Sequence, residues 1–375
     1  MFDFSPGEDL ELAVETARRF ADAVLAPQQR AHEAARGVPP EVRAQAREIG
    51  LDRIDWPESA GGAGLGALAR AVVLETLGGG DPGAAIALDP LGPVAHALCA
   101  FGGPDLLAEH AQALDALPGA RAVLVVDEPR GLRETDGRLT GVVPWVPSDR
   151  VDLLALLTRE GLTLVREDLV VEPLPGSGLG AAGAAQLRLD GAPVLASWTD
   201  PAAAARALAH ARLDAAALMV GQMTRAADDS RRYALDRVAF GKPIAHHQAL
   251  AFLIVDMRVA VDGAREMVRE AAWRLQSGLP YASAAAAAFL EAIDAGLFVG
   301  PNAVQILGAA GFMRDHPFEK AMRELRALGL LAGGADLARD DAWVDEPWAD
   351  GEAITGDVGR EGYGERPINL LAAEG

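Results

Sequence analysis

Few residues in this chain have the type and spacing that metal or nucleophilic chemistry needs. Cys99 is the only cysteine among the 375 residues, which excludes an intramolecular disulfide and a thiolate metal site. His246 and His247 are adjacent, and neighbouring side chains on a helix point in different directions. We therefore expect this pair to be ordinary surface or hydrogen-bonding residues, and we expect no metal site.

The densest glycine cluster is Gly-Gly-Ala-Gly at residues 61–64. In a dinucleotide-binding βαβ unit, such glycines follow a strand and open a helix. Here the cluster follows a helical pattern that starts after the prolines at residues 39–40 and ends near Gly50. The cluster is therefore predicted to be a loop, and a Rossmann fold is rejected.

The charge balance limits the partners of this chain. Its formal net charge of −20 argues against nucleic acid and against anionic lipid, because both need a basic surface. Only two lysines occur, Lys242 and Lys320, so a cationic pocket for a phosphorylated ligand would have to be local and built from arginine. The chain shows no signal-peptide pattern, and only alanine-rich segments approach the roughly 18 apolar residues of a membrane span. We expect a cytoplasmic protein.

Helical periodicity dominates both ends of the chain. Residues 1–118 are predicted to form an N-terminal helical domain, in which a helix at residues 67–77 is ended by the three glycines that follow. In residues 201–336, short connections separate four long helical segments, which predicts an up-down four-helix bundle. These segments cover residues 202–236, 246–276, 281–307 and 317–331. Residues 337–375 are predicted to be an acidic tail.

Residues 119–200 have a different pattern. Short apolar runs are separated by turn residues such as Asp-Gly at 136–137 and at 190–191, which predicts a small antiparallel β-domain. The runs cover residues 123–126, 153–157, 162–165 and 187–189. The expected fold class is therefore mainly α, with a small β-domain between an N-terminal helical domain and a C-terminal four-helix bundle.

Three segments in this order of domains carry a family resemblance. Residues 57–65 combine Pro-Glu with the glycine cluster. Residues 237–244 are Arg-Val-Ala-Phe-Gly-Lys-Pro-Ile, and Gln248 follows. Residues 305–312 are Gln-Ile-Leu-Gly-Ala-Ala-Gly-Phe, and residues 317–323 add Pro, Glu-Lys and Met-Arg. Together they resemble the N-terminal loop, the R-x-x-F-G-K-x-I…Q signature and the Q-x-x-G-G-x-G-Y…P-x-E-x-x-x-R-D run of the acyl-CoA dehydrogenase family.

The resemblance implies FAD as the cofactor, shared between two subunits. In that family the C-terminal bundle of one subunit holds the adenine and pyrophosphate end of the FAD bound mainly by its neighbour. Arg237 would pair with the pyrophosphate, since a guanidinium suits bidentate phosphate recognition, and Phe240 would pack on the cofactor. Gln248 and Gln305 would hydrogen-bond to it, and Gly308 would let the backbone approach closely. The implied partners are a homologous subunit or a second copy, in a tetramer, and an acyl-CoA thioester.

The positions that would bind the flavin ring within one subunit differ from the family pattern. Trp145 matches a tryptophan that packs against the isoalloxazine. Asp127 replaces a threonine whose hydroxyl would reach the flavin, and a carboxylate beside a flavin that becomes anionic on reduction is unfavourable. Pro147 replaces a second threonine, which would bond the flavin's reactive nitrogen, and proline has no donor.

The family's chemistry needs a carboxylate that removes the α proton of the thioester while a hydride leaves the β carbon. Counting from Arg323 places Ala332 at the usual glutamate position. Some members carry the glutamate on the first helix of the bundle, just before an arginine, and here these two residues are Ala211 and Arg212. Both base positions are alanine, so no catalytic base is predicted, whereas Arg212 is retained as a substrate-binding residue.

This asymmetry resembles the base-lacking subunit of heteromeric α2β2 members of the family. Our leading interpretation is a subunit that is not catalytic alone and completes an FAD site whose glutamate comes from the partner. One alternative is a self-sufficient acyl-CoA dehydrogenase with a displaced base, such as Asp336 or Glu128. The other is a non-redox binding or scaffold protein on the same fold.

Overall fold

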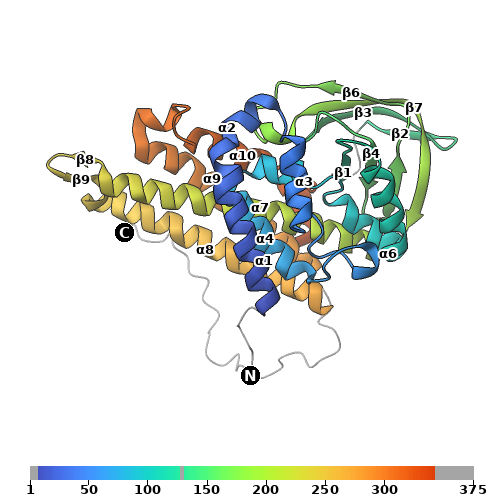
Figure 1. The fold of residues 1–375 in the computed structure, drawn as a ribbon, viewed down its shortest axis with the longest axis horizontal. Helices are drawn as coiled ribbons and strands as arrows, with labels where there is room; N and C mark the ends of the chain where they lie inside the picture. The colour runs from blue at the N-terminus through green and yellow to red at the C-terminus, as the bar shows by residue number, and fades with distance from the viewer. Residues whose placement is uncertain (1–6, 127–130, 343–375) are drawn as a thin grey trace, which may run out of the picture. The chain divides into compact units, whose positions relative to one another are not determined.

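The computed structural model describes residues 7–126 and 131–342, which belong to a single unit of the chain (Figure 1). Helices form both ends of this part of the chain, and a small sheet lies between them in the sequence. The predicted fold class is therefore confirmed. The boundaries after residues 118, 200 and 336 stay predictions, and helix α11 (Gly334–Ala342) runs across the last of them.

The N-terminal helices pack on the helices of the C-terminal half. Asp81 separates two of them, and its Oδ1 accepts a hydrogen bond from the backbone N–H of Ala84 at 3.2 Å, which caps the second helix. The elements are α1 (Glu8–Phe20), the π-helical η1 (Ala21–Leu25), α2 (Ala26–Ala35), α3 (Pro40–Glu48), η2 (Glu58–Ala60), α4 (Gly66–Gly80), α5 (Pro82–Leu88) and α6 (Val94–Asp115).

Helix α4 continues through Gly80, so our prediction that the three glycines end it is wrong. The cause is a close crossing with α7 (Pro201–Asp236). A Cβ at Gly78 would lie 2.5 Å from the carbonyl oxygen of Leu218, and a Cβ at Gly221 would lie 1.9 Å from that of Glu75. Glycine lets the two backbones approach where a side chain would collide, and this packing overrides glycine's weak intrinsic helix propensity.

The sheet has seven strands in the order β1-β4-β5-β7-β3-β2, with β6 also paired to β7. All pairs are antiparallel except β1 with β4, which are parallel. Strand β7 pairs with β3 through its first part and with β5 through its last part, so it joins the two halves of the sheet. The strands are β1 (Ala122–Val126), β2 (Arg133–Thr135), β3 (Arg138–Val146), β4 (Leu153–Leu157), β5 (Gly161–Val165), β6 (Leu169–Pro173) and β7 (Ala185–Thr199), with η3 (Gly180–Ala182) before the last.

Alternation along the strands divides the buried side chains of the sheet between two cores. In β4, Leu153 and Leu157 share a core with α6, whereas Leu154 and Leu156 share another with β3 and β7. Both faces of this strand are therefore buried, which explains its unbroken apolar sequence.

The C-terminal bundle consists of helices close to the four predicted segments. They are α7, α8 (Gln248–Ser277), α9 (Ala282–Leu307) and α10 (Phe318–Leu328), with the short elements β8 (Val238–Ala239), β9 (Lys242–Pro243), η4 (Ile244–His246) and η5 (Gly308–Phe312) between them. The segment Ala282–Phe312 is long and apolar enough to cross a membrane by length and composition alone. It also packs against α7, α8 and α10 and buries Phe289 completely, as the core helix of a bundle does.

Candidate functional site

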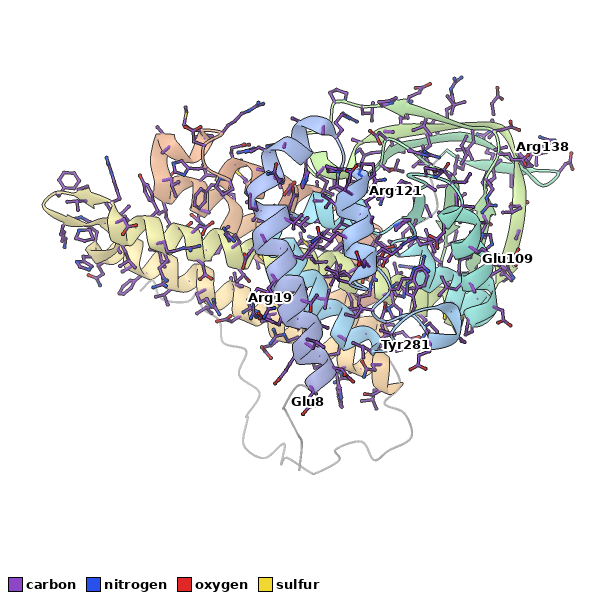
Figure 2. The ribbon with its side chains drawn as sticks, in the orientation of Figure 1. Glu8, Arg19, Glu109, Arg121, Arg138 and Tyr281 are labelled. Atoms are coloured by element: carbon purple, nitrogen blue, oxygen red, sulfur yellow. The ribbon has the colours of Figure 1, made fainter. Side chains whose placement is uncertain are left out.

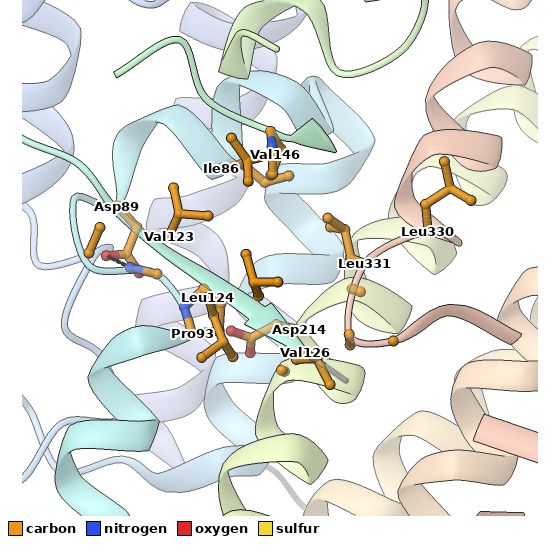
Figure 3. Close-up of a pocket in the computed structure, with 18 of the residues that line it drawn as sticks. Ile86, Asp89, Pro93, Val123, Leu124, Val126, Val146, Asp214, Leu330 and Leu331 are labelled. Carbon is orange, nitrogen blue, oxygen red and sulfur yellow. Dashed lines mark hydrogen bonds between the residues drawn. The ribbon is translucent and has the colours of Figure 1, made fainter. Parts of the chain in front are cut away.

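A cavity of about 390 Å³ lies where the N-terminal helices, the sheet and the C-terminal helices meet. Its walls come from α4, α5, the α5–α6 connection, β1, β3, α7 and the loop after α10 (Figure 3). Most lining residues are apolar. The volume is at the low end of the range of about 300–1,000 Å³ for small-molecule sites.

The structure brings both predicted base positions to this cavity. Ala211 lines it from α7, and Ala332 lines it from the loop between α10 and α11. Ala332 has a φ of 51°, and the two glycines that follow it also have positive φ, which makes the tight turn into α11. Neither methyl group can accept a proton, so neither position supplies a base.

The predicted flavin-facing residues of the sheet lie in the same place. Trp145 and Pro147 line the cavity from the end of β3, opposite residues of β1 that include Val126. Asp127 and Glu128 lie outside the described residues. Trp145, Pro147, Ala211 and Ala332 therefore all line the same cavity.

Four charged residues interrupt the apolar lining: Arg70, Asp89, Arg121 and Asp214. Nε and Nη2 of Arg70 donate to the two carboxylate oxygens of Asp214, each at 2.8 Å, and Nη2 also donates to Oδ2 of Asp89 at 3.3 Å. Burial acts to lower the pKa of Arg70, but the charges of Asp214 and Asp55 outweigh burial and raise this pKa well above its usual value. The side chain of Arg70 is 5% exposed, so it is held as a buried cation among carboxylates.

The guanidinium of Arg121 donates hydrogen bonds to backbone carbonyl oxygens, whereas that of Arg70 donates to carboxylates. Nη1 of Arg121 donates to the carbonyl oxygens of Ile86 at 2.7 Å and of Asp89 at 2.8 Å. Figure 2 labels Arg121 among the side chains of the molecule. Burial lowers the pKa of Arg121 to about 10, so it remains a cation at neutral pH.

Sequence reasoning missed these four residues. The signal that could have found one of them is the position of Asp214, one helical turn after Ala211 in an alanine-rich helix. A carboxylate on such an apolar face needs a partner, and that partner is Arg70, from a helix 144 residues earlier.

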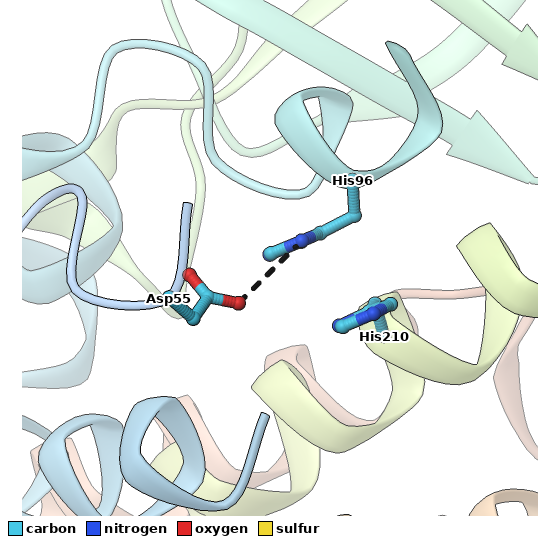
Figure 4. Close-up of side chains that lie close together, drawn as sticks. All are labelled: Asp55, His96 and His210. Atoms are coloured by element: carbon cyan, nitrogen blue, oxygen red, sulfur yellow. Dashed lines mark ion pairs between the residues drawn. The ribbon is translucent and has the colours of Figure 1, made fainter. Parts of the chain in front are cut away.

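Behind Asp214 the structure places a buried cluster of Asp55, His96 and His210 (Figure 4). Atoms able to ligate a metal lie within 4.8 Å of one another in this group. The two imidazoles stack, however, with centroids 4.2 Å apart and planes 5° apart. The lone pairs of ring nitrogens lie in the ring planes, so in this arrangement they do not converge on one ion. Burial lowers the pKa of His210 to about 3 and that of His96 well below its usual range, so both rings are neutral.

Arg212 does not line the cavity. Its side chain is 2% exposed, and its Nη2 donates to Oδ2 of Asp341 in α11 at 2.6 Å. Burial lowers the pKa of Arg212, and the hydrogen bond to Asp341 opposes that shift. Its predicted substrate-binding role stays a prediction.

The residues predicted to hold a neighbour's cofactor are exposed and lie outside the cavity: Arg237, Phe240, Gln248, Gln305 and Gly308. Arg237 precedes the β8–β9 hairpin, which Figure 1 shows at the end of α7 far from the sheet. Its guanidinium forms no ion pair or hydrogen bond with any residue of the described ranges. Phe240, at the hairpin tip, is 97% exposed with a φ of 52°.

The glutamines and the glycine of this set lie at helix ends. Gln248 is the first residue of α8, and Gln305 lies in the last turn of α9. Gly308 ends α9 with a φ of 62°, a conformation that favours glycine. An exposed cation and exposed amides at helix ends are groups that suit an anionic ligand.

Family models match both helical parts of the chain. The model described as "Acyl-CoA dehydrogenase, N-terminal domain" matches residues 7–112, and the one described as "Acyl-CoA dehydrogenase, C-terminal domain" matches residues 202–342. The chain belongs to the acyl-CoA dehydrogenase family. Members of this family are FAD-dependent oxidoreductases of lipid metabolism, form homo- or hetero-oligomers and bind acyl-CoA. The family predicted from the three motifs is confirmed.

Several relatives illustrate the range of similarity. The chain is 25% identical to the probable acyl-CoA dehydrogenase YngJ of Bacillus subtilis, over 90% of this chain and 97% of the relative. It is 34% identical to a short-chain specific acyl-CoA dehydrogenase of Clostridium acetobutylicum, over only 36% of each chain.

Solved structures agree on the fold. Butyryl-CoA dehydrogenase of Megasphaera elsdenii superposes with a TM-score of 0.79 at 21% identity, covering 91% of this chain and 98% of the other. A chain of the ChsE4-ChsE5 complex of Mycobacterium tuberculosis superposes with a TM-score of 0.78 at 26% identity, covering 90% and 97%.

Proposed function

We propose that this chain is a base-lacking subunit of an acyl-CoA dehydrogenase, which completes an FAD site for a catalytic partner in the α,β-dehydrogenation of an acyl-CoA thioester. The observation that carries this proposal is the meeting of Ala211 and Ala332 in one cavity. Two alternative positions for a base converge there, and both side chains are methyl groups. The glutamate that removes the α proton then comes from the partner.

The exposed residues fit the adenine and pyrophosphate end of a partner's FAD. Arg237 offers a guanidinium with no partner among the described residues, and Gln248 and Gln305 offer exposed amides. FAD, when bound, supplies the hydride acceptor of the reaction. The flavin end fits this chain's own cavity less well, because Pro147 has no donor for the ring.

The surface of α8 supports a partner subunit. Phe252, Val255 and Val259 are each more than half exposed and lie on one face of the helix. Together with Phe240 they give apolar side chains that a second subunit would cover. The similarity to a chain of the ChsE4-ChsE5 complex shows that this fold also occurs in a complex of two differently named chains.

One observation favours a self-sufficient enzyme as the second candidate. Asp214 is a carboxylate in the cavity, one turn from Ala211, and could act as a displaced base. Both of its oxygens, however, already accept hydrogen bonds from Arg70, so this carboxylate is engaged in a buried ion pair. Asp336, the other candidate, is fully exposed, pairs with Arg339 and does not line the cavity.

The test is flavin absorbance and native mass on the chain purified alone and after co-expression with a homologous subunit that carries the glutamate. We expect yellow protein only in the complex, with one flavin per pair of unlike chains. Arg237→Gln should lower the flavin content of that complex. Arg232→Gln, which removes the same charge from a nearby exposed arginine paired to Asp229, should leave it unchanged.

Other outcomes distinguish the alternatives. A yellow homo-oligomer that oxidises acyl-CoA alone, and loses activity as Asp214→Asn, would support the displaced base. Colourless protein in both preparations would support a binding or scaffold role.

We also propose a cytoplasmic location and keep the domain boundaries after residues 118, 200 and 336.

A further inference from the structure

Every carboxylate oxygen of Asp89 and Asp214 already has a hydrogen-bond donor. Both oxygens of Asp214 accept from Arg70, and Oδ2 of Asp89 accepts from the same guanidinium. Oδ1 of Asp89 accepts from the backbone N–H groups of Leu91 at 3.1 Å and of Gly92 at 2.7 Å. These two carboxylates and Arg70 therefore form a paired set in the cavity wall.

Among the described residues, Arg121 is the charged residue of the cavity wall with hydrogen-bond donors to spare. Its Nη1 donates to the carbonyl oxygens of Ile86 and Asp89, at the end of α5. Within residues 7–126 and 131–342, its Nε and Nη2 have no hydrogen-bond partner, and its guanidinium forms no ion pair with a carboxylate. One N–H on Nε and two on Nη2 are therefore open.

The open donors of Arg121 belong to a buried cation. Arg121 is 7% exposed and lines the cavity. Neither its Nε nor its Nη2 is among the fully buried, unpartnered polar atoms of the described residues, so both nitrogens keep accessible surface. Burial lowers the pKa of Arg121, and the charge of Arg43 adds to this shift, whereas carboxylates raise the pKa of Arg70 in the same wall. An acceptor on a ligand would therefore stabilise Arg121.

An end group that accepts hydrogen bonds without carrying charge fits these donors best. An alkyl end would dehydrate them without a compensating hydrogen bond. The two arginines and the two aspartates of the cavity wall balance in charge, so a carboxylate end would leave this buried space net negative. The oxygen of a ketone accepts hydrogen bonds and adds no charge.

We propose that this cavity binds an acyl thioester whose acyl group ends in a ketone, with the Nε–Nη2 edge of Arg121 donating to the ketone oxygen. Aliphatic side chains of the lining, such as those of Leu74, Ile86 and Leu218, contact the carbon chain. The inference rests on the proposed function in taking the ligand to be an acyl-CoA thioester. It does not depend on which subunit supplies the base.

The test is isothermal titration of the co-expressed complex with thioesters that differ only at the far end. Carbon 5 carries an oxo and a methyl group in 5-oxohexanoyl-CoA, two methyl groups in 5-methylhexanoyl-CoA and two carboxylate oxygens in glutaryl-CoA. We expect the ketone to bind about tenfold more tightly than its methyl isostere, as for one hydrogen bond with a charged group. Glutaryl-CoA should bind more weakly than the ketone. 4-Oxopentanoyl-CoA and 4-methylpentanoyl-CoA repeat the comparison in a chain that is shorter by one carbon.

Substitutions in this chain separate its cavity from the partner's site. Arg121→Met keeps an unbranched side chain and removes the donors, so the preference for the ketone should disappear. Arg43→Gln is the matched control, because it removes the neighbouring charge from a residue that does not line the cavity, and the preference should remain.

Three results would overturn the inference. The first is equal or tighter binding of the methyl isostere to the unsubstituted complex at both chain lengths. The second is a preference for the ketone that Arg121→Met leaves unchanged. The third is tighter binding of glutaryl-CoA than of 5-oxohexanoyl-CoA, which would indicate an anionic end instead.

A second variant preserves the readout if Arg121→Met does not fold. Arg121→Lys keeps an ammonium that donates to the carbonyl oxygens of Ile86 and Asp89 but lacks the Nε–Nη2 edge, so it should reduce the preference for the ketone severalfold. If no thioester binds to the complex, the proposed function and this inference both fall. Thioesters that bind without preference for the ketone overturn this inference alone, and flavin content then still reports on the shared FAD site.

Discussion

A buried ion cluster predicts a distinctive pH dependence of stability. Nζ of Lys320 on α10 donates to Oδ1 of Asp81 at 3.0 Å and to Oε1 of Glu324 at 2.5 Å, and all three side chains are at most 1% exposed. One cation thus faces two carboxylates. Burial raises the pKa of Glu324 to about 7 from its usual 4.5, although Lys320 opposes the shift.

The sign and size of the effect follow from that shift. A glutamate whose folded pKa is raised stabilises the fold fully below pH 4.5, and that contribution is lost as the pH rises through about 7. A difference of about 2.5 in pKa corresponds to about 3 kcal/mol. Glu324→Gln keeps an oxygen for Lys320 but cannot ionise. Between pH 5 and pH 8 the free energy of unfolding should therefore fall by about 3 kcal/mol relative to this variant.

The assay is urea denaturation at several pH values in that window. His32, whose pKa is lowered by burial, also titrates near the cluster, but it is common to both proteins and cancels in their difference. The matched control is Glu319→Gln on the same helix. Burial acts to raise the pKa of Glu319, but hydrogen bonds from Arg323 and Arg30 outweigh burial and lower this pKa. The carboxylate of Glu319 therefore stays ionised throughout the pH window. Parallel pH profiles of Glu324→Gln and the unsubstituted protein would refute the reasoning.

Two further predictions concern a buried ion pair and a close helix crossing. Asp341→Asn should lower the free energy of unfolding by about 2 kcal/mol in urea denaturation, because the buried guanidinium of Arg212 loses its countercharge. Asp340→Asn, on the exposed neighbour, should change it by less than about 0.5 kcal/mol, and equal effects would contradict this assignment. Gly221→Ala should lower the melting temperature sharply, because its methyl group would lie 1.9 Å from a carbonyl oxygen of α4. Gly263→Ala, on α8 with no atom within 4 Å of the added methyl, should leave it unchanged or raise it.

Much of the fold was predictable because its signals are local. The long amphipathic segments of residues 201–331 and the short connections between them gave the bundle helices nearly to the residue. The apolar runs predicted β1, β4 and β5. Periodicity within a strand does not show whether its neighbour runs parallel or antiparallel, so the parallel pairing of β1 with β4 was missed. Strand β3 was missed because Gly141 and Pro144 interrupt it, and the structure has a bulge at that proline.

The site was only partly predictable. Motif spacing identified Ala211, Ala332 and Trp145, and the structure brings all three to one cavity. The charged residues of the cavity were missed because Arg70 and Asp214 have no local relation in the sequence. Their pairing depends on the crossing of α4 and α7, a tertiary contact that no periodicity encodes.

The long separation between Arg70 and Asp214 has a consequence for how the chain is made. During synthesis the N-terminal helices leave the ribosome 144 residues before the carboxylate that neutralises Arg70. Until α7 has been synthesised, the guanidinium of Arg70 must stay hydrated, so the N-terminal helices cannot bury this part of their core on their own. The loop that carries Ala332 arrives later still. The cavity is therefore closed near the end of synthesis, and fragments that stop before α7 should be recognised by chaperones and proteases as unfinished.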